Sequence, residues 1–240
     1  MPELLCGGSR WHHAGTTDVD VQVDLEIACG AVNASRLERA LRNAEFEPDG
    51  EYVWRWALEG AEPNTIVKFE LLADLNNEQA GSVVNFDGCE RLGAVNLRGT
   101  GFAARDIEGR RLAARIGGVP YEVEVNVTGL AGFLLAKTAA AYGRQKPKDW
   151  YDIAFVLLHN DAGGPDAAAA AVRARFPNDI TGATRTALNE LRANFNHPGS
   201  QGARAYAEQM LLDHPELDAA TLRADAVLAV GRFHSIVCAD

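Results

Sequence analysis

Residues 7–20 read GGSRWHHAGTTDVD, a glycine-rich turn followed by two aspartates with one residue between them. From Asp18 to Ile27 an acid or amide alternates with an aliphatic residue, and this period of two predicts a half-buried β-strand. Side chains two apart on a strand leave from the same face, so Asp18 and Asp20 can share a cation. We expect the glycine turn to follow a short apolar strand at Leu4–Cys6 and to lead into a helical turn, where its N–H groups can approach a phosphate.

The rest of the chain divides into a strand-rich part and a helical part. Four further strands are predicted in the first part: Tyr52–Leu58, Thr65–Leu72, Ser82–Phe86 and Tyr121–Val127. A short helix is predicted over Ser35–Phe46, with Ser35 as N-cap and Glu38 at capping-box spacing. From Thr128 onward the pattern becomes alanine-rich and helical, with predicted helices at Gly129–Tyr142, Lys148–His159, Pro165–Phe176, Ile180–Asn194, Gln201–Asp213 and Ala219–Val237. We therefore expect an α/β domain at 1–127 and a helical domain at 128–240.

The composition excludes several classes of protein. With 240 residues, 47% hydrophobic and 23% charged, the chain is of the ordinary globular type. It holds no apolar stretch of the ~20 residues that a membrane span needs. The first residues carry no basic region typical of a secretory signal, and the four cysteines form no CxxC pair. A cytoplasmic, reducing location is expected. The net charge of −10, concentrated in residues 1–125, argues against a general nucleic-acid binder.

A second informative block spans residues 137–152, KTAAAYGRQKPKDWYD. Lys137 lies in an otherwise apolar stretch, where an ammonium group needs a partner. Asp149 and Asp152 are three residues apart and so share one face of a helix. Between these charges lies a basic corner of Arg144, Lys146 and Lys148.

Together the two blocks resemble the DNA polymerase β-like nucleotidyltransferase superfamily, and the second block is similar to that of the AbiEii-type nucleotidyltransferases. These are the toxins of many type IV toxin–antitoxin pairs. The resemblance implies an α+β fold, in which a polymerase β-like domain with a mixed sheet and flanking helices precedes an α-helical domain. It also implies transfer of a nucleoside monophosphate from an NTP to a hydroxyl acceptor, with Mg²⁺ or Mn²⁺ as cofactor. The implied acceptor is the 3′ end of tRNA, and the implied protein partner is a cognate antitoxin.

The resemblance also implies a role for each matching residue. Gly7, Gly8, Ser9 and Lys137 would bind the nucleotide, whereas Asp18 and Asp20 would bind the metal. A third metal carboxylate is expected from Glu70, with Glu124 as the competitor. Asp152 would position Lys137 or the nucleotide, and Asp149 would pair with Arg144 or cap its helix.

Other residues near these blocks have two interpretations. Arg144, Lys146 and Lys148, followed by Trp150 and Tyr151, could contact RNA through phosphates and stacked bases, or the rings could belong to the core. His12 and His13 have no further ligand at zinc spacing and are interpreted as loop residues near the nucleotide.

The chain departs from the family at its start. Family members usually carry a helix before the glycine turn and an arginine shortly before the first metal aspartate, but here the turn begins at residue 7 and Ala14 stands in the arginine's place. Two alternatives to this function stay open, the first favoured by the net charge of −10 and the second by the missing N-terminal helix. The first is nucleotidyl transfer to a protein or a small molecule such as an aminoglycoside. The second is a catalytically silent module that binds a nucleotide or a partner.

Overall fold

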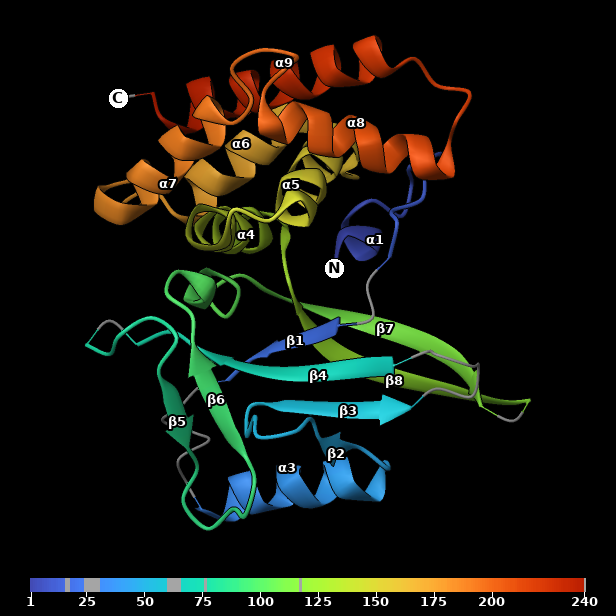
Figure 1. The fold of residues 1–240 in the computed structure, drawn as a ribbon, viewed down its shortest axis with the longest axis vertical. Helices are drawn as coiled ribbons and strands as arrows, with labels where there is room; N and C mark the ends of the chain where they lie inside the picture. Colours follow the sequence, from blue (N-terminus) through green and yellow to red (C-terminus); the bar gives the residue numbers. More distant parts are fainter. Residues whose placement is uncertain (16–17, 24–30, 60–65, 76, 117, 240) are drawn as a thin grey trace. The chain divides into compact units, whose positions relative to one another are not determined.

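The computed structural model describes the chain except residues 16–17, 24–30, 60–65, 76, 117 and 240, and the side chains of 31, 32, 114 and 116. The fold is mixed α+β, as predicted (Figure 1). Two compact units are present: residues 16–104 form one, and residues 1–15 together with 105–240 form the other. The predicted domain boundary between residues 127 and 128 stays a prediction.

The unit of residues 16–104 is built on a six-stranded mixed sheet. Its central strand, β4 (Ile66–Ala73), pairs in parallel with β1 (Asp18–Gln22) and β6 (Gly93–Asn96), and antiparallel with β3 (Arg55–Glu59). Two short edge strands, β2 (Glu47–Pro48) and β5 (Val83–Asn85), complete the sheet, and a 3-10 turn spans Thr100–Phe102. Helix α3 (Ala31–Asn43) packs on the sheet through Ala34 and Leu41, in one buried cluster with Trp56 and Leu71.

Ser35 and Glu38 do not form the predicted capping box, because Ser35 lies inside α3 rather than at its start. Its hydroxyl donates to the Gly88 carbonyl at 3.0 Å. The Glu38 carboxylate accepts the N–H groups of Glu90 and Arg91 at 3.1 and 2.8 Å. The two side chains therefore satisfy a neighbouring turn instead of their own helix.

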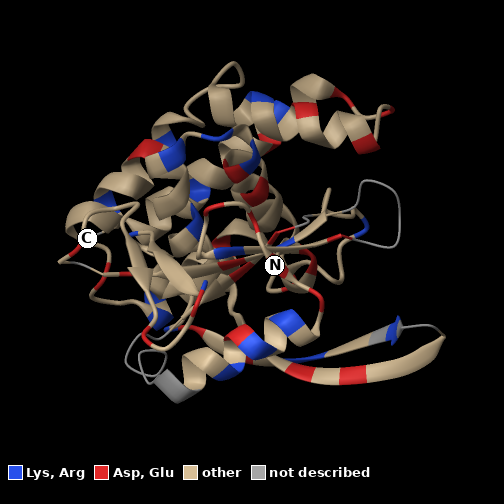
Figure 2. Ribbon diagram, turned by 60° about the horizontal axis from the view of Figure 1, so that its bottom comes forward, with Lys and Arg blue, Asp and Glu red and all other residues tan. Residues whose placement is uncertain are grey.

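The other unit is mainly helical. It contains the short α1 (Pro2–Leu5), the antiparallel hairpin of β7 (Ile107–Ile116) and β8 (Val119–Thr128), and six longer helices. The six helices are α4 (Leu130–Arg144), α5 (Pro147–His159), α6 (Gly164–Arg175), α7 (Gly182–Ala193), α8 (Gln201–Asp213) and α9 (Ala219–Val237). All six were predicted within about two residues at each end, whereas α1 corrects the strand predicted at Leu4–Cys6. Lys and Arg residues are interspersed with Asp and Glu along these helices (Figure 2).

Helix α5 is the centre of this unit. Every residue from Asp149 to Leu157 is buried, and α4, α6, α8 and α9 all contact the helix. A helix that is apolar on nearly all sides needs such a cage of neighbours. Polar groups that α5 carries into the interior need partners within this unit. Among the described residues, Asp149 Oδ2 and Trp150 Nε1 are buried without a hydrogen-bond partner.

We predict opposite effects for two glycine-to-alanine substitutions in the helices. A Cβ atom at Gly202 on α8 would overlap the buried ring of Phe195, whereas one at Gly143 on α4 meets nothing within 4 Å. Gly202→Ala should lower the free energy of unfolding by about 1–3 kcal/mol through overpacking. Gly143→Ala should raise it by about 0.5–1 kcal/mol because alanine favours the helix. Urea unfolding followed by far-UV circular dichroism measures both, and a neutral Gly202→Ala would contradict the close packing of Gly202 against Phe195.

Candidate active site

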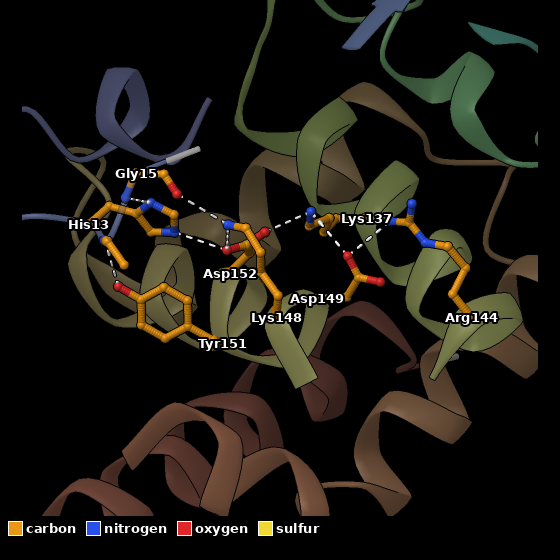
Figure 3. A network of polar contacts seen from close by, with 9 residues as sticks. His13, Gly15, Lys137, Arg144, Lys148, Asp149, Tyr151 and Asp152 are labelled. Carbon is orange, nitrogen blue, oxygen red and sulfur yellow. Dashed lines mark hydrogen bonds and ion pairs between the residues drawn. The ribbon is translucent and has the colours of Figure 1, made fainter. Parts of the chain in front are cut away.

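Lys137, Asp149 and Asp152 are positioned by the corner between α4 and α5. Gln145 ends α4 in the left-handed conformation with φ 54°, and Pro147 begins α5, where the missing N–H costs no helical hydrogen bond. Asp149 and Asp152, one helical turn apart, then point at Lys137 on α4. Lys137 Nζ lies 2.6 Å from Asp152 Oδ2 and 3.1 Å from Asp149 Oδ1 (Figure 3).

Lys137, Asp149 and Asp152 form a largely buried cluster in which the ammonium group has more N–H donors than carboxylate partners. The side chain of Lys137 is 18% exposed, and those of Asp149 and Asp152 are each 4% exposed. An ammonium group has three N–H donors, and the two carboxylates accept two of them. The third N–H of Lys137 therefore has no carboxylate partner among the residues that the structure describes.

The charges in the cluster stabilise one another. Burial opposes the charged form of Lys137, but the carboxylates of Asp152 and Asp149 outweigh it and raise the pKa of the ammonium above its ordinary 10.5. Burial alone would also raise the pKa of Asp152. The hydrogen bond from His13 and the charges of Lys137 and Lys148 instead lower that pKa from 3.8 to about 2. Lys137 and Asp152 are therefore both ionised at neutral pH.

Two further cations, both more exposed than Lys137, lie beside the carboxylates of Asp149 and Asp152. Arg144 Nη2 lies 2.9 Å from Asp149 Oδ1, and Lys148 Nζ lies 3.3 Å from Asp152 Oδ1. Three cations thus surround two carboxylates, and the excess positive charge favours an anion. Lys146 is exposed at the N-cap of α5. The pairing of Asp149 with Arg144 is the one that the resemblance implied.

Trp150 and Tyr151 are core residues and cannot stack on RNA. Their exposed fractions are 0% and 1%. Trp150 packs edge-on against Phe195, and Tyr151 stacks on Tyr206. Of the two interpretations left open by the sequence, the structure therefore supports the second.

His13 belongs to the cluster, which the sequence did not indicate. Its Nε2 lies 2.9 Å from Asp152 Oδ1, and its side chain is 2% exposed. The sequence predicts a loop residue, because no further ligand stands at zinc spacing, and His13 does lie outside the helices and strands. Its partner Asp152 stands 139 positions away in the chain. No local spacing signals a contact over that separation.

The glycine turn binds a carboxylate of the same chain, that of Asp161. The N–H groups of Gly7 and Gly8 donate to the two carboxylate oxygens of Asp161, at 3.1 and 2.8 Å. Ser9 Oγ accepts the N–H of Trp11 at 3.0 Å, which leaves its own hydroxyl hydrogen as a donor. The turn follows helix α1, and no helical turn comes after it at residues 10–15. Both flanking elements expected at this turn were therefore wrong, although its amides do face a carboxylate.

Asp18, Asp20 and Glu70 lie on neighbouring strands of the sheet. The parallel pairing of β1 with β4 sets Asp20 beside Glu70 and Asp18 beside Lys68. Burial raises the pKa of Glu70; Arg55 opposes that shift, whereas the negative charges of Asp20 and Asp18 add to it. The sheet register thus brings the three carboxylates into electrostatic contact.

The fit of these carboxylates to a divalent cation rests mainly on Asp18 and Asp20. Both are exposed and project from one face of β1, and carboxylate oxygens are the ligands that Mg²⁺ prefers. Glu70 instead accepts a hydrogen bond from Arg55 Nε at 2.6 Å. Among the described residues, no three His, Cys, Asp or Glu side chains gather closely enough to hold a metal ion. Glu124 is exposed on β8, opposite Arg111.

A comparison with protein families identifies the chain. The model of the AbiEii nucleotidyl transferase toxins of type IV toxin–antitoxin systems matches residues 95–230, more than half of the chain. The chain belongs to this family. No curated protein and no solved structure matches it.

Family membership supports a nucleotidyltransferase with an NTP substrate and an antitoxin partner. The matched region contains Lys137, Asp149 and Asp152, whereas the glycine turn, Asp18–Asp20 and Glu70 lie outside it. Among the described residues, no helix combines the length and apolar character needed to cross a membrane.

We predict that Asp152 makes the fold sensitive to acid. Because its pKa in the folded protein is about 2 rather than 3.8, the ionised carboxylate stabilises the fold at neutral pH. That stabilisation, about 2 kcal/mol, should be lost as the pH falls from about 4 towards 2. Urea unfolding at pH 7, 4, 3 and 2.5 should show a shallower acid loss for Asp152→Asn than for the wild type. The exposed control Asp225→Asn should retain the wild-type slope, and equal slopes in all three proteins would contradict the prediction.

Proposed function

We propose that the chain transfers a nucleoside monophosphate from an NTP to the 3′ end of tRNA. The observation that carries this proposal is the buried Lys137 between Asp149 and Asp152, in the region that matches the family. In the reaction, a hydroxyl oxygen of the acceptor forms a bond to the α-phosphorus and the bond to pyrophosphate breaks. The hydroxyl proton is released to water.

Lys137 would bind the triphosphate through the N–H that its two carboxylates leave over. Asp152 and Asp149 keep the ammonium charged and fix its direction, so that it needs no reorganisation when the phosphates arrive. Ser9 would donate its hydroxyl hydrogen to a phosphate oxygen. For Gly7 and Gly8 to bind phosphate as well, the carboxylate of Asp161 must leave their amides.

Asp18 and Asp20 would hold one or two Mg²⁺ or Mn²⁺ ions. Bound there, such an ion would supply charge neutralisation to the triphosphate and would help to orient the attacking hydroxyl. Asp18 stands three positions after Gly15, whose carbonyl accepts a hydrogen bond from Lys148. The metal-binding role of Asp18 and Asp20 rests on the resemblance to nucleotidyltransferases.

The acceptor is an inference from the resemblance to AbiEii-type enzymes. Arg144, Lys146 and Lys148 are exposed around the cluster and offer positive charge to an RNA backbone. Binding through these side chains should weaken steeply with salt, which a small-molecule acceptor would not require.

We predict RNA labelling that depends on the β1 carboxylates. The full chain is incubated with Mg²⁺, total RNA and each of the four α-³²P-labelled NTPs, and the products are separated on a denaturing gel. The wild type should label the tRNA band with one or more donors. Asp18→Asn combined with Asp20→Asn should reduce the label about 100-fold or more, because the cation loses its ligands. Asp87→Asn, an exposed acid on a turn, is the matched control and should label normally.

Each other outcome of the labelling assay replaces the tRNA proposal. Label on the protein moves the acceptor to a polypeptide. If neither RNA nor protein is labelled but equilibrium dialysis shows Mg²⁺-dependent NTP binding, the chain is a silent nucleotide-binding module. Label on an added aminoglycoside identifies a small-molecule acceptor.

A second prediction concerns the third carboxylate. Glu70→Gln should raise the Mg²⁺ concentration for half-maximal transfer about tenfold or more, because Glu70 neighbours Asp20 on the sheet. Glu124→Gln is the comparison and should leave that concentration unchanged. A Mg²⁺ titration of both variants measures this, and a shift confined to Glu124→Gln would reverse the assignment.

A further inference from the structure

His13 is a buried imidazole whose two nitrogens are both in use. Nδ1 accepts the N–H of Gly15 at 3.1 Å, and Nε2 lies 2.9 Å from Asp152 Oδ1. A nitrogen that accepts a hydrogen bond carries no proton, so in the neutral ring the proton belongs to Nε2, which donates to the carboxylate. The hydrogen-bond partners thus assign the Nε2–H tautomer.

Packing holds the ring in this orientation. It stacks on Tyr151 with a centroid distance of 4.9 Å and meets Phe155 edge-on at 5.1 Å. With a side-chain exposure of 2% and both nitrogens engaged, His13 cannot reach a substrate directly. Any effect on the reaction must pass through the groups that it holds.

One of those groups is the carboxylate that pairs with Lys137. Asp152 Oδ1 accepts hydrogen bonds from His13 Nε2 at 2.9 Å and from Lys148 Nζ at 3.3 Å. The other carboxylate oxygen, Oδ2, lies 2.6 Å from Lys137 Nζ. The donor on Oδ1 fixes the carboxylate plane and directs Oδ2 at the ammonium. This is how a partner behind a functional side chain sets its orientation.

The other group is the segment that leads to β1. Gly15, with φ 76°, donates its N–H to His13, and its carbonyl accepts Lys148 Nζ at 3.2 Å. Beside it, the Ala14 N–H donates to Tyr151 Oη at 3.0 Å. Residues 13–15 are therefore attached to α5 by several bonds, three residues before Asp18 in the chain (Figure 3).

We propose that His13 is a positioning residue for nucleotidyl transfer: its Nε2–H orients Asp152 towards Lys137. The proposal rests on the proposed function of Lys137. It assigns His13 no contact with the nucleotide or the acceptor.

Two substitutions of His13 test its hydrogen bonds to Asp152 and to Gly15 one at a time. An asparagine amide oxygen lies near the place of Nδ1, so His13→Asn can keep the bond from Gly15 but loses the donor to Asp152. A glutamine amide nitrogen reaches the place of Nε2, so His13→Gln can keep the donor to Asp152 and loses the bond from Gly15. His12→Gln changes the exposed neighbouring histidine and is the matched control.

Transfer kinetics of these variants form the first test. We expect His13→Asn to lower kcat about 10- to 100-fold, because a misdirected Lys137 no longer meets the phosphates in line. His13→Gln should lie within about threefold of the wild type, and His12→Gln should be unchanged. If His13→Asn and His13→Gln lower the melting temperature equally and retain wild-type kcat and KM once the folded fraction is counted, the role is structural and the proposal is overturned.

A spectroscopic measurement decides the question without the transfer assay. In ¹⁵N-labelled full chain, the His13 imidazole should show the Nε2–H pattern, and the Lys137 ammonium resonance should move in His13→Asn but not in His13→Gln or His12→Gln. A different tautomer, or an unmoved Lys137 resonance in His13→Asn, would refute the positioning role. A wild type that transfers no label while its spectra match these expectations would refute the proposed function and leave the assignment of His13 standing.

Discussion

The ion pair between the buried Lys137 and the two carboxylates of α5 is the interaction on which the site depends. Removing an ammonium from water costs several kcal/mol, and this cost is met only if its partners are placed correctly. Asp149 and Asp152 can be so placed because α4 and α5 are joined by a tight corner at Gln145–Pro147. The ion pairs that stabilise the corner between α4 and α5 also hold the Lys137 ammonium group in one orientation. Stability and the readiness of the site for an anion therefore have a common origin.

Helix α5 links this cluster to the rest of the helical unit. Its two buried aspartates lie beside aromatic and aliphatic residues that are also buried, so the carboxylates stand in largely apolar surroundings. Just after its end, Asp161 binds the glycine turn, and near its start Asp152 binds His13. One helix thus determines the position of Lys137, of the N-terminal turn and of the segment before β1.

The glycine turn shows that a local motif fixes a kind of chemistry and not a particular partner. Amide groups that point into one space bind whichever anion is most concentrated there. Asp161 belongs to the same chain and is held nearby by the fold, so its effective concentration is high. A free phosphate must compete with it. The motif alone indicates only that an anion is bound.

The sequence by itself determined the mixed fold, the six long helices, strands at β1, β3, β4, β5 and β8, and the shared helix face of Asp149 and Asp152. Hydrophobic periodicity and the i, i+3 spacing of Asp149 and Asp152 are local, so a reader of the sequence can find them. Tertiary structure alone decided that β6 and β7 are strands. β6 is a four-residue, fully buried segment without alternation, and β7 exists through its pairing with β8. It also decided that Ser35 and Glu38 serve a distant turn, that Asp161 fills the glycine turn, and that His13 orients Asp152. These contacts join residues roughly 50 to 150 positions apart, and such separations leave no periodic trace in the chain.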